Sequence, residues 1–108
     1  MDNDQQRMIA EAESLLLNRL NQMLQLLGDS HWSEHFRDVR AKWLRARTWE
    51  QKHAAASHIR SVYGGMGSFN DWYLEGDDGL DFDALRSELY ELSRMYERPE
   101  IARAMLED

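Results

Sequence analysis

Apolar residues recur every three or four positions along most of this chain, and that spacing is the feature that most constrains its fold. It predicts a first helix from about Asp4 to Leu27, with Asp4 as its N-cap and Gly28 as a left-handed residue just past its end. No segment alternates strictly enough to predict a strand. The 108 residues suit one domain, so we expect an all-α, single-domain bundle of four to five helices spanning residues 1–108.

The same spacing and the usual end signals predict four more helices. Their expected starts are Asp29 or Ser30, Thr48, Asp81 or Asp83, and Pro99. Thr48 and Gln51 fit a capping box, and Pro99 suits a first helical position because its missing N–H group needs no partner there. The apolar faces of these helices define the expected core: Met8, Leu16, Leu20, Leu27, Trp32, Phe36, Trp43, Ile59, Leu85, Leu89 and Leu92.

A glycine-rich loop separates the third predicted helix from the fourth. Three glycines in four residues are too costly in backbone entropy for a helix interior, so we expect a helix C-cap and a tight reversal with positive φ angles. The short side chains of Asn70 and Asp71 are suited to holding such a loop through backbone hydrogen bonds. The expected structural motif is Gly64, Gly65, Met66, Gly67, Ser68, Asn70 and Asp71.

The charge of the chain is unevenly distributed. The net charge of −7 divides into +1 for residues 1–63 and −8 for residues 64–108, with a local +5 between residues 37 and 60. Either the basic middle and the acidic end face each other and partly cancel, or the acidic end is free to attract a basic partner. The negative total disfavours binding to nucleic acid.

Composition and short motifs exclude several kinds of chemistry. The absence of cysteine rules out disulfides and thiolate sites, and the longest apolar run, Leu15–Leu17, is too short to cross a bilayer. The acidic start of the chain is unlike a secretory signal, so we expect a cytoplasmic protein without a membrane association.

Two metal motifs are matched only in part. His31, Glu34 and His35 form the His-x-x-Glu-His pattern of inverted zinc proteases on a predicted helix. Such a protease also needs a third ligand, which a distant Glu could supply, and a substrate cleft, for which 108 residues leave little protein, so we expect solvent-facing histidines. The segment from residue 77 to 88 has the length of an EF-hand loop, yet Phe82 stands where that loop requires glycine. We expect neither a metal nor another cofactor.

Residues 61–74, Ser-Val-Tyr-Gly-Gly-Met-Gly-Ser-Phe-Asn-Asp-Trp-Tyr-Leu, resemble the signature of an uncharacterised bacterial family of small proteins. That signature has an aromatic residue at a helix end, then Gly-Gly-Met-Gly-Ser, a bulky apolar residue, Asn and Asp. The resemblance implies a bacterial source and a mainly helical domain. By analogy, small acidic proteins of this kind often neutralise a toxin or dock onto a partner.

No complete catalytic constellation is recognisable, so the leading hypothesis is a non-enzymatic interaction protein of the immunity or inhibitor type, which binds a protein with a basic surface. Its expected contact residues combine steering carboxylates with two aromatic anchors: Trp72, Tyr73, Glu75, Asp77, Asp78, Asp81 and Asp83. Two alternatives stay open. One is a small enzyme or ligand-binding domain with its site at the Gly64–Asp71 loop, and the other is a structural homodimer that packs through a surplus apolar helix face.

Overall fold

All the regular secondary structure in the described part of the chain is helical, and this part contains no strand. The computed structural model describes residues 3–64 and 79–106, and for residues 79–81 it describes the backbone alone. The helices are α1 (Asn3–Leu27), α2 (Ser33–Arg45), α3 (Trp49–Arg60), α4 (Gly79–Ser93) and α5 (Pro99–Leu106), with a 3-10 turn, η2 (Met95–Glu97), before the last. These helices confirm the predicted all-α bundle. Within the described ranges, no helix is both long enough and apolar enough to pass through a membrane.

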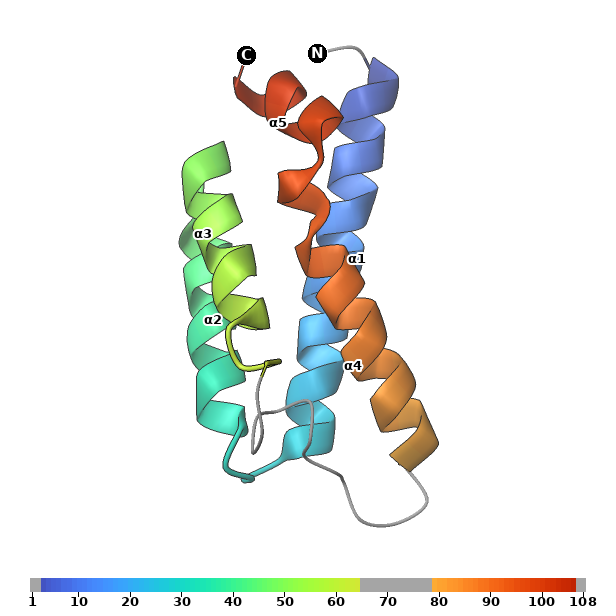
Figure 1. The fold of residues 1–108 in the computed structure, drawn as a ribbon, viewed down its shortest axis with the longest axis vertical. Helices are drawn as coiled ribbons and strands as arrows, with labels where there is room; N and C mark the ends of the chain where they lie inside the picture. Colours follow the sequence, from blue (N-terminus) through green and yellow to red (C-terminus); the bar gives the residue numbers. More distant parts are fainter. Residues whose placement is uncertain (1–2, 65–78, 107–108) are drawn as a thin grey trace.

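The four long helices run alternately down and up the bundle (Figure 1). α1 descends along α4, while α2 and α3 form an antiparallel hairpin that packs against both of them. α5 lies across the end of the bundle where α1 begins. The predicted glycine loop starts at Gly64, at the opposite end, and its remaining residues lie outside the described ranges.

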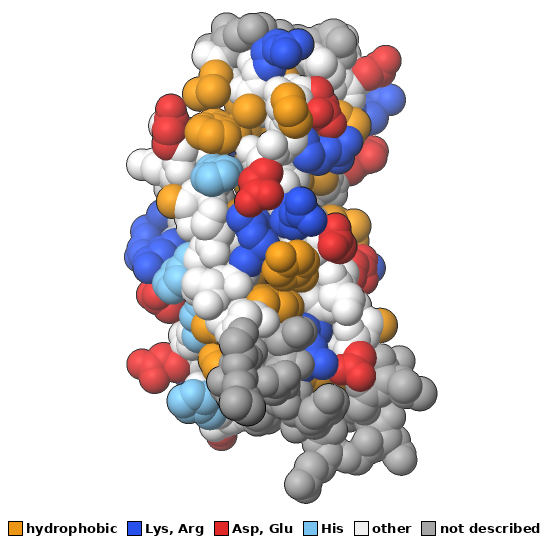
Figure 2. All heavy atoms as spheres, viewed as in Figure 1, with side chains coloured by type: hydrophobic (Ala, Val, Ile, Leu, Met, Phe, Trp, Pro, Cys, Tyr) orange, Lys and Arg blue, Asp and Glu red, His pale blue; other side chains and the backbone are white. Residues whose placement is uncertain are grey.

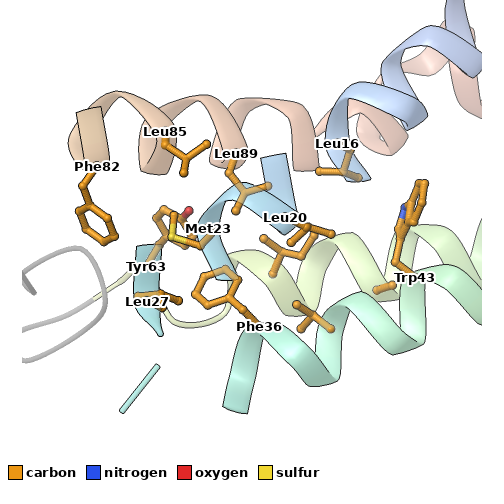
Figure 3. Close-up of a cluster of buried hydrophobic side chains, with 13 residues drawn as sticks. Leu16, Leu20, Met23, Leu27, Phe36, Trp43, Tyr63, Phe82, Leu85 and Leu89 are labelled. Carbon is orange, nitrogen blue, oxygen red and sulfur yellow. The ribbon is translucent and has the colours of Figure 1, made fainter. Parts of the chain in front are cut away.

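The main core lies among the four long helices (Figure 3). α1 contributes Leu16, Leu20 and Met23, which are fully buried, and these meet aromatic side chains from the other helices. Of the expected core residues, eight are buried: Leu16, Leu20, Leu27, Phe36, Trp43, Ile59, Leu85 and Leu89.

Three expected core residues lie elsewhere. Trp32 and Leu92 are half-buried and pack against the edge of the core. Met8 is 41% exposed, so its assignment to the core is wrong. The inward position on that turn belongs to Ile9, which packs in a second cluster with Tyr96 and residues of α5.

The predicted starts were accurate for α3 and α5 and inaccurate for α1, α2 and α4. α1 already includes Asn3, so Asp4 lies in its first turn and is not its N-cap. The capping box is confirmed, because the Gln51 N–H group donates to Thr48 Oγ1 at 3.1 Å while Gln51 Oε1 accepts from the Thr48 N–H group at 3.3 Å. Pro99 begins α5 as predicted. However, α2 begins later than expected, at Ser33, and α4 begins at Gly79, so neither Asp81 nor Asp83 is its N-cap.

Gly28 and Gly64 differ in their conformational demands. Gly28 has a φ of +55°, and its N–H group donates to the Leu24 carbonyl at 3.1 Å, as expected of a left-handed helix end. Gly64 has no positive φ, and a Cβ added to it would meet nothing within 4 Å. The expectation that Gly64 supplies a positive φ or a close backbone approach is therefore wrong.

This difference leads to a prediction about two matched substitutions. Gly28→Ala should lower the free energy of unfolding by about 1 kcal/mol, because an L residue is strained in the left-handed region. Gly64→Ala should change it by less than about 0.5 kcal/mol, because nothing surrounds the added methyl group. Urea denaturation of both variants measures this contrast, and equal destabilisation would contradict it.

Candidate functional site

A hollow of about 480 Å³ lies between the end of α3 and the middle of α4. It is lined by Arg60, Tyr63, Gly64, Arg86, Ser87, Tyr90 and Glu91. Because Gly64 forms part of its rim, it is the described feature closest to the predicted ligand site at the Gly64–Asp71 loop. Its chemistry depends on what its polar side chains already contact.

Tyr63 fastens the end of the α3 segment to α4. Its buried hydroxyl group donates to the Arg86 carbonyl at 2.9 Å, and its ring packs on Tyr90 with the ring centroids 5.1 Å apart. Burial raises the pKa of the Tyr63 hydroxyl above its usual value, because the phenolate would be poorly solvated there. Tyr63 therefore stays protonated and acts as a fixed donor.

The two arginines on the lining are also engaged. Arg86 is buried, forms an ion pair with Asp83 and lies over the Phe82 ring, 5.2 Å from its centroid. Arg60 donates to the Ser93 carbonyl at 2.6 Å and forms an ion pair with Glu97. Since Ser93 ends α4, the Arg60 guanidinium neutralises the negative end of that helix.

These contacts make the hollow a polar seam between helices. Its two guanidinium groups and the Tyr63 hydroxyl bind the bundle's own atoms, and no histidine lies on its described lining. The arrangement can hold the ends of α3 and α4 in register. On the described lining, the Ser87 hydroxyl group forms no hydrogen bond with Glu91, so the two do not form a nucleophile paired with a base.

Most of the predicted contact and loop residues lie outside the described residues. These are Gly65, Met66, Gly67, Ser68, Asn70, Asp71, Trp72, Tyr73, Glu75, Asp77 and Asp78. Asp81 belongs to α4, where only its backbone is described. Asp83 is the one predicted contact residue with described surroundings, and its carboxylate pairs with Arg86 in the same helix.

The His-x-x-Glu-His pattern does not form the helical face that was expected. His31 precedes α2, which begins only at Ser33, so His31 and His35 do not sit one turn apart within a helix. His31 is exposed, but His35 is half-buried, so the expectation of solvent-facing histidines is wrong for His35. Across residues 3–64 and 79–106, no group of three His, Asp or Glu side chains could hold a metal ion.

His35 packs against a second histidine that the sequence pattern did not connect to it. The rings of His35 and His58 are 5.0 Å apart at nearly right angles, across the seam between α2 and α3. Burial and the nearby His58 and Lys42 lower the pKa of His35 below its ordinary 6.5, and the backbone of Ile59 and the Asp38 carboxylate oppose that shift. The Lys42 ammonium group lies 3.2 Å from Nδ1 of His58.

A further polar cluster joins three elements far apart in the sequence. Lys52 of α3 forms an ion pair of 2.5 Å with Glu13 of α1, and the Tyr96 hydroxyl donates to the same carboxylate oxygen. Burial and this hydrogen bond raise the pKa of Tyr96. The sequence carries no local signal for this cluster, because its members are 39 and 83 positions apart.

The basic stretch of residues 37–60 has few ion pairs with the described part of the acidic end of the chain. Among the described residues, one ion pair joins this stretch to residues 79–106, and it is the pair between Arg60 and Glu97. Lys42 and Lys52 pair with Asp38 and Glu13, which both precede the glycine loop.

The fold and these contacts define a small helical bundle whose polar clusters join its helices to one another. The chain belongs to the family described as a domain of unknown function, DUF6966, which matches residues 25–82. The match begins at the end of α1 and extends through α2 and α3 to the first residues of α4. No curated protein matches the chain, and no solved structure does.

The position of Arg60 leads to a prediction about stability. Arg60→Gln should lower the free energy of unfolding by about 2 kcal/mol, because it removes charge-assisted hydrogen bonds to a buried helix end. Arg94→Gln is the matched control, since Arg94 faces the same Glu97 but is 53% exposed, and it should cost less than about 1 kcal/mol. Thermal unfolding of the two variants compares them, and similar losses would argue against a capping role for Arg60.

The lowered pKa of His35 leads to a prediction about pH. The folded state favours the neutral imidazole, so this contribution is complete well above pH 6.5 and is lost as the pH falls below that value. The midpoint of thermal unfolding should therefore drop between pH 8 and pH 5.5, and His35→Asn should reduce that drop. His31→Asn, which removes an exposed imidazole, should preserve it.

Proposed function

We propose that this protein is a non-enzymatic interaction module, of the immunity or inhibitor type, that acts in the bacterial cytoplasm on a protein partner with a basic surface. The observation that carries the proposal is the distribution of charge between the bundle and the rest of the chain. Residues 3–64 and 79–106 carry 13 basic and 13 acidic side chains, a net charge of zero. The remaining residues carry seven carboxylates and no base, which accounts for the entire −7.

Four of those carboxylates fall within residues 65–78, together with Trp72 and Tyr73. A run of carboxylates without a basic residue attracts cationic surfaces over a long range, and aromatic side chains provide the contact area that anchors a complex. The proposed contact set is the one inferred from the sequence, with Asp77 and Asp78 as its acidic centre.

The described contacts support this proposal, because they hold together the parts of the chain that flank residues 65–78. Tyr63 stands just before the segment, and its hydroxyl group bonds to the backbone of Arg86, which comes after it. Phe82 and Leu85 anchor the same part of α4 in the main core. A segment with fixed ends loses less entropy on binding than one at a free terminus.

A ligand-binding role is the second candidate, favoured by the volume of the hollow beside Gly64, about 480 Å³. It is the weaker of the two, because Arg60, Tyr63 and Arg86 on that lining bind the bundle itself. Homodimer formation is a third candidate. Met8 and Leu15 are both exposed on one stripe of α1, which gives a small apolar face.

A capture experiment tests the leading proposal. The immobilised protein is exposed to a lysate of the source cells, and the retained proteins are identified by mass spectrometry. We expect a basic protein that is retained by the wild type and released by added salt, and that is lost with Asp77→Lys combined with Asp78→Lys. The matched control combines Asp4→Lys with Glu11→Lys, which reverses the same charge on the exposed face of α1 and should retain the partner.

Three outcomes would contradict the proposal: no basic protein is retained, the Asp77 and Asp78 variant retains it equally, or the α1 control loses it as well. Light scattering at two protein concentrations distinguishes the third candidate. A mass that doubles at the higher concentration would favour the homodimer over a monomer awaiting a partner.

A further inference from the structure

A second groove, separate from the hollow beside Gly64, runs between α2 and α3 and has a volume of about 390 Å³. Its lining consists of Lys42, Arg45, Ala46, Gln51, Ala54, Ala55 and His58. The three alanines give the lining an apolar part, and the other four lining residues have longer polar side chains. Figure 2 shows cationic and histidine side chains along the edge of the molecule formed by these two helices.

Two of the four polar side chains have already used their acceptor atoms. The Oε1 atom of Gln51 accepts from the N–H groups of Arg47 and Thr48 at 2.8 and 3.3 Å, which leaves its NH₂ group as a donor. Nδ1 of His58 lies 3.2 Å from the Lys42 ammonium group, which can only donate. Nδ1 is therefore the acceptor, and Nε2 of His58 carries the proton.

The other two polar side chains are cations. The ammonium group of Lys42 has three N–H donors, of which two are directed at His58 and at Asp38, 3.3 Å away. Arg45 forms no ion pair or hydrogen bond within the described part of the chain, and it is exposed. Every polar side chain on the groove's lining thus has donor capacity to spare and no spare side-chain acceptor.

Two sources of negative charge near the groove oppose the binding of an anion, and contacts in the structure reduce the effect of each. α2 ends beside the groove, and a helix C-terminus carries negative partial charge. The Arg47 guanidinium donates to the carbonyls of Leu44 and Ala46 at 3.0 and 3.3 Å, which offsets that charge. Asp38 competes for Lys42, but its carboxylate is not on the lining and is exposed to solvent.

We propose that this groove binds the phosphate group of a small organic phosphate. A phosphate monoester presents three peripheral oxygens with about two negative charges, which suits a lining with four donor side chains better than the two oxygens of a carboxylate do. The groove is much larger than a phosphate group alone. The alanines supply an apolar surface for the organic part of the ligand. This site is independent of the acidic contact set, so either proposal can fail without the other.

The test uses phenyl phosphate as the probe, followed by NMR titration of the whole protein at pH 7.5. We expect saturable shifts of the Gln51 side-chain NH₂ signals and of the Ala54 and Ala55 amides. Lys42→Gln and Arg45→Gln should each weaken binding about tenfold, since a charge-assisted hydrogen bond is lost. Both side chains are exposed, so circular dichroism should show that both variants fold as the wild type does.

Two controls separate a specific site from general attraction. Arg37→Gln removes an exposed charge from α2 away from the groove and should change binding less than twofold. Asp38→Asn frees Lys42 from its carboxylate partner and should strengthen binding severalfold. Benzoate, which carries the same ring on a carboxylate, should bind more weakly than phenyl phosphate.

Each contrary result overturns the proposal. Absence of saturable shifts with phenyl phosphate removes the site. Equal weakening by Arg37→Gln and Arg45→Gln would mean that the charge of the hairpin, and not the groove, attracts the probe. Benzoate binding as tightly as phenyl phosphate would overturn the assignment to a phosphate.

Discussion

The packing of α1 into the space between α4 and the α2–α3 hairpin is the interaction on which the rest of the bundle depends. Leu16, Leu20 and Met23 are completely buried there, and each side chain of this size contributes about 1.5–3 kcal/mol when it leaves water. The hairpin and α4 also contact each other directly, and both share the core cluster that these three side chains enter. The polar clusters are built on this frame, because their members meet only once the helices have been brought together.

Those polar clusters then decide how the helices are aligned lengthwise. A leucine stripe alone tolerates sliding by a turn, whereas a guanidinium on a particular carbonyl does not. Arg60 holds α3 against the end of α4, and Glu13 holds α1 against both Lys52 and Tyr96. The same hairpin that supplies Arg60 and Lys52 also carries the donor-lined groove, so alignment and surface chemistry come from one short part of the chain.

The sequence predicted those features that a few neighbouring residues determine. Thr48 with Gln51, Pro99 at the start of α5 and the left-handed Gly28 each depend on contacts within about one helical turn. The start of α4 was missed because Asp81 has the composition of a cap, but the helix continues back to Gly79. Two other contacts could not be predicted from local spacing, because they depend on how the helices pack. They are the ring contact between His35 and His58 and the hydrogen bond from Arg60 to the Ser93 carbonyl.

The alternating course of the four long helices has a practical consequence. Asn3 and Leu106 lie at one end of the bundle, while Gly64 and Gly79 lie at the other (Figure 1). A tag, dye or surface attachment joined to either terminus is thus at the end of the bundle opposite the place where residues 65–78 leave and rejoin the helices. Protein immobilised through either terminus therefore leaves the end of the bundle with Gly64 and Gly79 accessible to other molecules.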